Sequence, residues 1–221
     1  MDLLELDENR DIYNEFMTVL LKQFPMSAPE PIVAIYTAEP LPLVMSYTEV
    51  ETLAFHLSLQ LKILERRDCS LLFWQSSDIL FVNKKLYLLA NLMNLVPITF
   101  APITFAPITF APITFAPIKS DQIVLNYPAI FPFPKAVCAP ELLKMKALPF
   151  ITHKSLSYYS LALMCLQKLN LSLEELQGTL QGTLHGTLQG TLQGTLHGTK
   201  LFYFLERCLK EDPSERVLIN L

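Results

Sequence analysis

All six glycines of this 221-residue chain lie within one short repeat, between Gly178 and Gly198. Loops that hold nucleotide phosphates need glycine, because their backbone must approach the phosphate closely and adopt positive φ angles. The rest of the chain therefore cannot contain a Walker phosphate loop, a dinucleotide-binding Gly-x-Gly-x-x-Gly motif or another glycine-rich phosphate loop. The glycine distribution alone excludes these classes of nucleotide-binding protein.

Two low-complexity tracts interrupt an otherwise complex sequence. Residues 96–118 repeat the unit Pro-Ile-Thr-Phe-Ala, and residues 176–199 repeat the unit Leu-(Gln or His)-Gly-Thr. Units of four or five residues are too short to form the modules of a solenoid. We therefore interpret both tracts as insertions into a pre-existing domain. We expect the first to be an extended surface loop of partly polyproline-like character.

The first tract lies in an uncharged stretch, Leu86 to Ile118, that is long enough to cross a bilayer as a helix. A proline recurs at every fifth residue of the tract. Each proline removes a helix hydrogen bond and clashes with the preceding turn, and the lost bonds are costly in lipid. We therefore expect no membrane span.

Charge, cysteine and histidine patterns restrict the function further. The net charge of −4 gives no basic footprint, so no nucleic-acid partner is expected. The four histidines show no metal-ligand spacing, so no metal site is expected. The acidic first residues show no basic region followed by an apolar stretch, so no secretory signal is expected. The cysteines form no Cys-x-x-Cys pair, which favours buried thiols in an intracellular, cytoplasmic protein; they are Cys69, Cys138, Cys165 and Cys208.

Apolar spacing and turn residues predict an α+β fold of helices and short strands. Thr48 and Glu51 form a predicted capping box, and an apolar stripe follows them at helical spacing. The predicted helices are Asn9–Phe24, Thr48–Leu64, Ser155–Leu169 and a helix through Leu201, Leu205, Cys208 and Leu209 that stops before Asp212 and Pro213. The predicted strands are Ile32–Tyr36, Leu41–Tyr47, Ile79–Val82 and Leu86–Leu89, the last two forming a hairpin around Asn83, Lys84 and Lys85.

Four local motifs occur in the order in which eukaryotic-type protein kinases carry them. Residues 43–49 read LVMSYTE, which is similar to the hinge strand of the family. Residues 139–141 read Ala-Pro-Glu, as at the end of the activation segment. Residues 157–162 read SYYSLA and resemble the start of a buried large-lobe helix, and residues 205–216 end in the family's Asp-Pro-x-x-Arg block. The chain thus resembles a serine/threonine protein kinase from the small-lobe helix onward.

The resemblance implies a protein-kinase-like fold that consists mainly of the helical C-terminal lobe. Residues 1–47 would be a remnant of the small lobe, with its helix and the hinge strands, and residues 48–221 would be the large lobe with the two inserted tracts. The family's structural ion pair between the Ala-Pro-Glu glutamate and the terminal arginine would join Glu141 to Arg216. A planar guanidinium matches a carboxylate in bidentate fashion.

The resemblance also implies that the catalytic positions are replaced. Phe73 stands where kinases carry the catalytic aspartate, Asp78 at the catalytic-loop asparagine and Asn91 at the metal-binding aspartate. Glu15 matches the small-lobe glutamate, yet no lysine precedes Lys22 to pair with it. A phenyl ring accepts no proton, and a neutral amide holds Mg²⁺ poorly. Glu15, Asp78 and Asn91 remain weak candidates for nucleotide contacts.

These replacements predict a pseudokinase, a catalytically inactive module that binds a protein partner and needs no cofactor. The lost small-lobe strands would expose apolar surface, which commonly contacts a partner. One alternative is a divergent serine/threonine kinase that uses ATP and Mg²⁺ and takes its lid from another chain. The other is a decaying gene product without activity, which the regular repeats would also fit.

Overall fold

The structure, a computed structural model, describes residues 10–23, 38–98, 122–125, 136–147, 150–171, 196 and 198–218. These residues form a mixed α and β fold with small antiparallel sheets, so the α+β prediction is confirmed at this level. Within them, no helix is both long enough and apolar enough to cross a membrane. The helices are α1 (Arg10–Gln23), α2 (Tyr47–Arg66), α3 (Pro140–Leu143), α4 (Leu156–Lys168) and α7 (Lys200–Cys208), with short 3₁₀ turns at Ser76–Asp78 and Pro213–Glu215.

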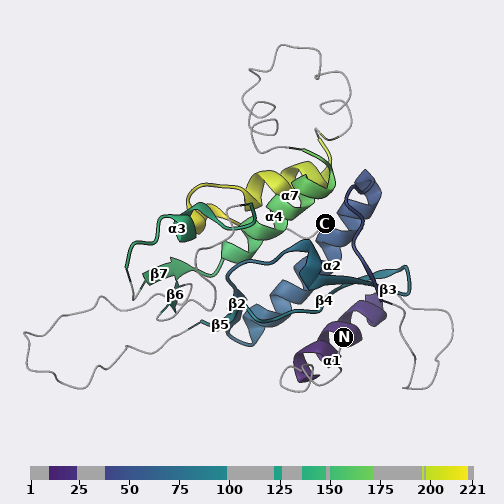
Figure 1. The fold of residues 1–221 in the computed structure, drawn as a ribbon, viewed down its shortest axis with the longest axis horizontal. Coiled ribbons are helices and arrows are strands. Elements are labelled where there is room, and N and C mark those ends of the chain that lie inside the picture. Colours follow the sequence, from purple (N-terminus) through teal and green to yellow (C-terminus); the bar gives the residue numbers. More distant parts are fainter. Residues whose placement is uncertain are drawn as a thin grey trace, which may run out of the picture.

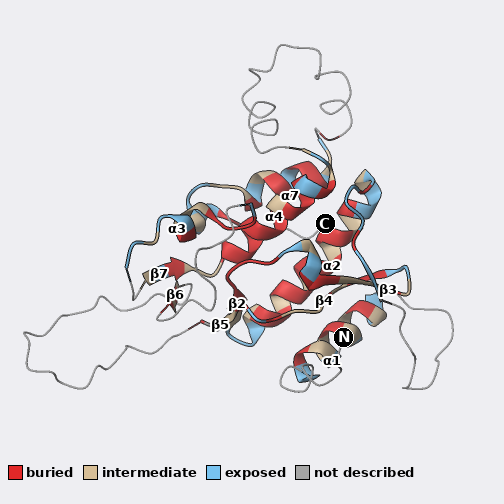
Figure 2. Ribbon diagram, in the orientation of Figure 1, coloured by how far each residue is buried: buried red, intermediate tan, exposed pale blue. Residues whose placement is uncertain are grey.

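The long helices pack in series around one main core. α2 lies between α1 and α4, and α4 lies beside α7 (Figure 1). α4 is buried on nearly every face, as predicted for this helix (Figure 2). Phe16 from α1 and Leu161 from α4 share the core, so side chains on both sides of the expected 47/48 boundary contribute to it. The predicted stripe of α2 is buried in full; it comprises Val50, Leu53, Leu57, Leu61 and Leu64.

Three small antiparallel sheets surround the helices. The predicted hairpin is confirmed with its bounds, and its three-residue connection begins with Asn83 and Lys84 at positive φ angles of 49° and 56°, closed by Lys85 N donating to Val82 O at 3.0 Å. The predicted strand Ile32–Tyr36 lies outside the described residues. The sheets are β1 (Ala38–Pro40) with β3 (Ile79–Val82) and β4 (Leu86–Leu89), β2 (Cys69–Leu71) with β5 (Leu95–Pro97), and β6 (Gln122–Leu125) with β7 (Phe150–His153).

Two predictions about the start of α2 are wrong. The predicted strand Leu41–Tyr47 is absent, since this segment bends and hydrogen-bonds to the end of α4, with Met45 N donating to Lys168 O at 2.8 Å. Its apolar residues Leu43 and Val44 are 90% and 61% exposed, so no sheet buries them. The segment that resembles a kinase hinge strand is therefore a loop over most of its length.

The capping box of α2 lies two residues before the predicted one. Ser46 is the N-cap, and its backbone N–H donates to Glu49 Oε2 at 2.7 Å, while Glu49 N donates back to Ser46 Oγ at 3.4 Å. The predicted box of Thr48 and Glu51 does not form, because Thr48 is already inside the helix. The hydrogen bonds from Ser46 also lower the pKa of the Glu49 carboxyl.

The edges of both low-complexity tracts belong to the fold. Strand β5 extends into the first tract, and Ile98 is buried with its N–H donating to Asp68 O at 2.7 Å. At the end of the second tract, Leu196 is buried in the main core and Thr199 caps α7 by accepting from Phe202 N. Gly198 between them has a φ of 80°, which favours glycine. Residues 99–118 lie outside the described residues, so the expected polyproline-like loop does too.

Buried polar side chains of α2 fasten the helix to β4. His56 Nδ1 accepts from Tyr87 N at 3.2 Å, which puts the imidazole proton on Nε2. Gln60 bonds the same strand twice, donating to Tyr87 O at 2.9 Å and accepting from Leu89 N at 2.9 Å. Both side chains are fully buried, so this polar contact fixes the register between helix and strand.

Stability is expected to fall in acid because His56 must stay neutral. Burial lowers the pKa of His56 to about 4. A folded-state pKa below the unfolded value near 6.5 makes the contribution complete above pH 6.5 and lost as the pH falls towards 4. The slope should reach about 1.4 kcal/mol per pH unit in this window.

The test is urea unfolding of the wild type and of His56→Asn between pH 7 and pH 4. The asparagine carbonyl can still accept from Tyr87 N but does not titrate. The wild type should lose more stability across the window than the variant does. Parallel stability curves for the two proteins would contradict a buried, neutral His56.

Candidate functional site

Asp78 and Asn91, which the kinase resemblance would place at the catalytic-loop and metal-binding positions, lie in contact. Asp78 Oδ1 accepts from Asn91 Nδ2 at 2.8 Å, and Asp78 Oδ2 accepts from Gln75 N at 2.7 Å. The Asp78 carbonyl accepts from Ala90 N at 2.7 Å. Asp78 is buried, with 8% of its surface exposed. The carboxylate thus joins the turn before β3 to the segment after β4.

The chemistry open to this pair is narrow. The side-chain oxygen of Asn91 is also hydrogen-bonded, since Oδ1 accepts from Met93 N at 3.0 Å. Mg²⁺ demands octahedral oxygen ligands and strips water reluctantly, and this pair would offer it only side-chain oxygens that already accept hydrogen bonds. Among the described residues no cluster of three or more acidic, histidine or cysteine side chains could hold a metal. The pair is a structural clamp, and it offers one carboxylate and one amide.

Phe73, which the kinase resemblance would place at the catalytic aspartate, is buried inside the protein. Only 1% of its surface is exposed. Its ring belongs to a second core that also holds Leu72, Ile123, Leu156 and Tyr159. A residue without access to solvent cannot meet a protein substrate.

Glu15 holds α1 against the end of α2. Its carboxylate accepts from Arg67 Nε at 2.8 Å and from Arg66 Nη2 at 3.3 Å. All three side chains are part-exposed, so these pairs contribute at most about 1 kcal/mol each. Tyr13 on the same helix donates to Ala90 O at 2.8 Å, beside the Asp78–Asn91 clamp. The Glu15 carboxylate is thus engaged by Arg66 and Arg67.

Glu141 and Arg216 come together in a bidentate ion pair. Arg216 Nη1 and Nη2 donate to the two Glu141 carboxylate oxygens at 2.5 and 2.9 Å. The Arg216 side chain is fully buried, and that of Glu141 is 16% exposed. The pair fastens α3 to the C-terminal segment.

Further contacts of Arg216 were not apparent from the sequence. Its Nε donates to Lys210 O at 2.7 Å, and Nη2 donates to Glu211 O at 3.0 Å. The guanidinium carbon also lies 4.7 Å from the centroid of the Tyr159 ring, which is a cation–π contact. The buried cation is therefore fully engaged, as a desolvated guanidinium must be.

The cysteines offer no activated thiol among the described residues. Burial raises the pKa of Cys138 and of Cys165 to about 12, and it raises the pKa of Cys208 further. A thiol nucleophile needs a lowered pKa and access to solvent. These three thiols behave as small apolar core residues, which fits their place in the main and second cores.

Comparison with known proteins found no matching family model and no curated protein with significant sequence similarity. Any assignment of function to this chain therefore rests on its own residues and their contacts.

Proposed function

We propose that this chain is a kinase-like module that does not transfer phosphate and acts by binding a protein partner. The proposal depends on the surroundings of two residues, Phe73 and Asp78. Phe73 is buried in apolar core, and both carboxylate oxygens of Asp78 are engaged by Gln75 and Asn91. Phosphoryl transfer depends on positioning and charge neutralisation by carboxylates, metal and lysine, so these positions supply almost none of its requirements.

The kinase-like part of the proposal is supported by the Glu141–Arg216 pair. It joins the Ala-Pro-Glu motif to the terminal arginine across 75 residues, the contact that the family resemblance implies. The order of α1, α2, the β3–β4 hairpin, α3 and α4 is compatible with the same scheme.

The binding part of the proposal is supported by apolar side chains at the surface. Leu43 and Val44 before α2 are mostly exposed, and Met93 after the Asp78–Asn91 clamp is 73% exposed. Leu43 and Val44 are adjacent and place two large apolar side chains in solvent, a surface that a partner could cover.

Addition of ATP and Mg²⁺ is expected to leave the melting temperature of the purified chain unchanged. A nucleotide at 100 times its Kd would stabilise the fold by about 2.7 kcal/mol, which corresponds to a shift of several degrees. Differential scanning fluorimetry with ATP, with and without EDTA, measures this directly.

Asp78→Asn is the comparison variant, because it removes the charge that a metal needs; its amide keeps only one of the two acceptor oxygens, so its melting temperature without nucleotide serves as its own baseline. A magnesium-dependent shift that disappears in Asp78→Asn would contradict the proposal. It would favour a divergent kinase that takes its missing lid from another chain.

A further inference from the structure

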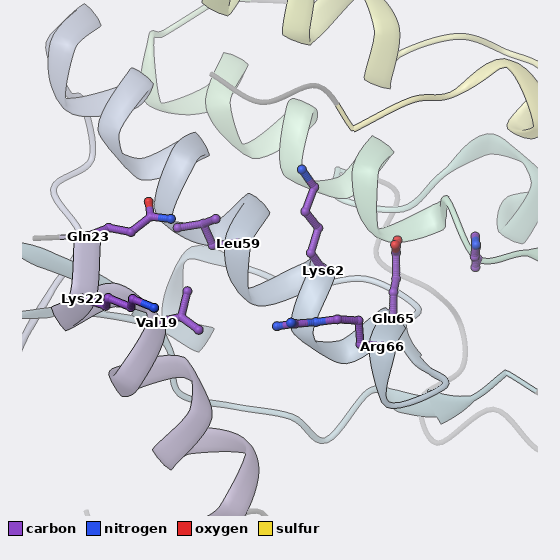
Figure 3. Close-up of a pocket in the computed structure, with 8 residues that line it drawn as sticks. Val19, Lys22, Gln23, Leu59, Lys62, Glu65 and Arg66 are labelled. Atoms are coloured by element: carbon purple, nitrogen blue, oxygen red, sulfur yellow. The ribbon is translucent and has the colours of Figure 1, made fainter.

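A hollow of about 870 Å³ lies between the C-terminal halves of α1 and α2, and we call it the α1–α2 groove (Figure 3). Four cationic side chains line it. Lys22 comes from α1, Lys62 and Arg66 come from α2, and Lys154 comes from the turn between β7 and α4. Glu65 is the one carboxylate in its lining. The hollow is largely open to solvent, which suits an extended chain lying on the surface better than an enclosed small molecule.

The groove is a positive site on a negative chain. Four cations line the groove beside the single carboxylate of Glu65, and one of them, Arg66, also pairs with Glu15 outside it, so positive charge still exceeds negative charge here on a chain of net charge −4. Glu65 keeps its charge, and its Oε1 accepts a hydrogen bond from the Tyr158 hydroxyl, which directs the carboxylate towards α4. A concave surface with one sign of charge focuses the field and concentrates ligands of opposite charge. The ligand of this groove should therefore be acidic.

The walls of the groove are fixed by contacts outside it. Glu15 pairs with Arg67 and Arg66, which ties α1 to the end of α2. Leu20 is fully buried against the β3–β4 hairpin, which sets the position of the last turns of α1. The Lys154 carbonyl accepts from Ser70 Oγ at 2.9 Å, which fixes the third wall. The cations thus project from elements that are already in place, so binding requires little ordering of backbone.

The groove also has an apolar part, formed by Val19 of α1 and Leu59 of α2, both half-buried. Both helices end beside it, α1 at Gln23 and α2 at Arg66. Helix C-termini carry partial negative charge and present carbonyls, whereas phosphates are held by the N–H groups of helix N-termini. These ends disfavour a compact phosphate. Carboxylates spread along a peptide can instead meet long lysine side chains while an apolar side chain covers Val19 and Leu59.

We infer that the α1–α2 groove binds an acidic peptide segment of a partner protein, with an apolar side chain of that segment on Val19 and Leu59. The inference rests on the proposed binding role, but it does not depend on the kinase-like fold. It identifies the surface that binds the partner and the acidic, partly apolar character of the partner segment.

The probe is a fluorescein-labelled peptide, Glu-Glu-Leu-Leu-Glu-Glu, titrated with the whole chain and followed by fluorescence anisotropy. We expect saturable binding that weakens as salt rises. Reversing two groove charges, in the variant Lys22→Glu with Lys62→Glu, should weaken binding at least about tenfold. The matched control is Lys144→Glu with Lys146→Glu, an equal charge change on exposed lysines outside the groove, which should bind like the wild type.

Each remaining outcome decides for or against the inference. If the charge reversal impairs folding, Lys22→Gln with Lys62→Gln removes the same charges more mildly and should still weaken binding severalfold. Absence of saturable binding, or equal binding by the groove and control variants, would overturn the inference. The inference would also be overturned if the peptide Glu-Glu-Ser-Ser-Glu-Glu bound with equal affinity and tripolyphosphate displaced both peptides. The groove would then bind polyanions in general and not an acidic peptide with an apolar side chain. None of these failures would alter the nucleotide result, so the two proposals fail separately.

Discussion

Glu141→Ala is expected to destabilise the fold by about 3–5 kcal/mol, because it leaves a fully buried guanidinium without its counter-ion. Arginine cannot escape by losing its proton. The carbonyls of Lys210 and Glu211 and the ring of Tyr159 would remain, but none of them carries a compensating charge. A domain of this size has a total stability of about 5–15 kcal/mol, so the loss is large. Guanidinium chloride unfolding followed by circular dichroism measures it.

Two controls separate the buried charge from the loss of one side chain. Replacing both partners, as in Glu141→Ala with Arg216→Met, removes the uncompensated cation and should recover part of the loss. Glu215→Ala changes an exposed carboxylate next to Arg216 and should alter stability by less than about 0.5 kcal/mol. If Glu141→Ala costs no more than Glu215→Ala, the ion pair does not hold α3 to the C-terminal segment in solution.

Phe73→Asp, which introduces the residue that the kinase resemblance implies at this position, should unfold the protein and leave it without activity. Removing a buried phenyl ring costs about 3–5 kcal/mol, and a carboxyl without partners in apolar core adds several more. The sum is comparable to the stability of the whole domain. We expect no cooperative thermal transition and mostly insoluble protein on expression.

Phe73→Leu is the matched control for this substitution. It keeps an apolar side chain and should cost only about 1–2 kcal/mol, with a cooperative transition retained. A soluble Phe73→Asp protein that melts as cooperatively as Phe73→Leu would mean that position 73 reaches solvent. Burial of position 73 could then no longer support the proposal that the chain does not transfer phosphate.

The sequence pattern predicts those helices and strands that are specified by residues close together in the chain. The β3–β4 hairpin keeps its predicted bounds, because apolar runs flank Asn83 and Lys84 in a turn that needs two positive φ angles. α2 and α4 were predicted from apolar spacing, and their core faces are buried as expected. These elements need only nearby residues to specify them.

The start of α2 shows why a correct motif can be assigned to the wrong residue. Both Ser46 and Thr48 precede a glutamate by three positions, so both fit a capping box. With Ser46 as the cap, Met45 and Val50 take the positions of a hydrophobic staple, and both are buried in the main core. The Thr48 frame would put a polar threonine in place of Val50. Side-chain burial therefore decides between frames that the motif leaves open.

Long-range pairing limited the rest of the prediction. β2 pairs with β5 and β6 pairs with β7 across long separations, and such short strands carry little signal of their own. The exposed run at Leu43 and Val44 reads as a strand by propensity, yet no partner strand covers it. At the candidate site, alignment indicated Asp78, Asn91, Glu141 and Arg216, but not the contacts of Tyr159 or the α1–α2 groove. Those features arise only when distant segments meet.

The most direct test of the central claim is a phosphotransfer assay with purified wild-type chain, γ-labelled ATP, Mg²⁺ and a generic basic protein substrate. The same assay on Asp78→Asn with Asn91→Ala sets the background. The account predicts that the wild type incorporates no more label, into itself or the substrate, than this double variant does. Incorporation by the wild type that disappears in the double variant would contradict the account and identify the chain as a divergent kinase.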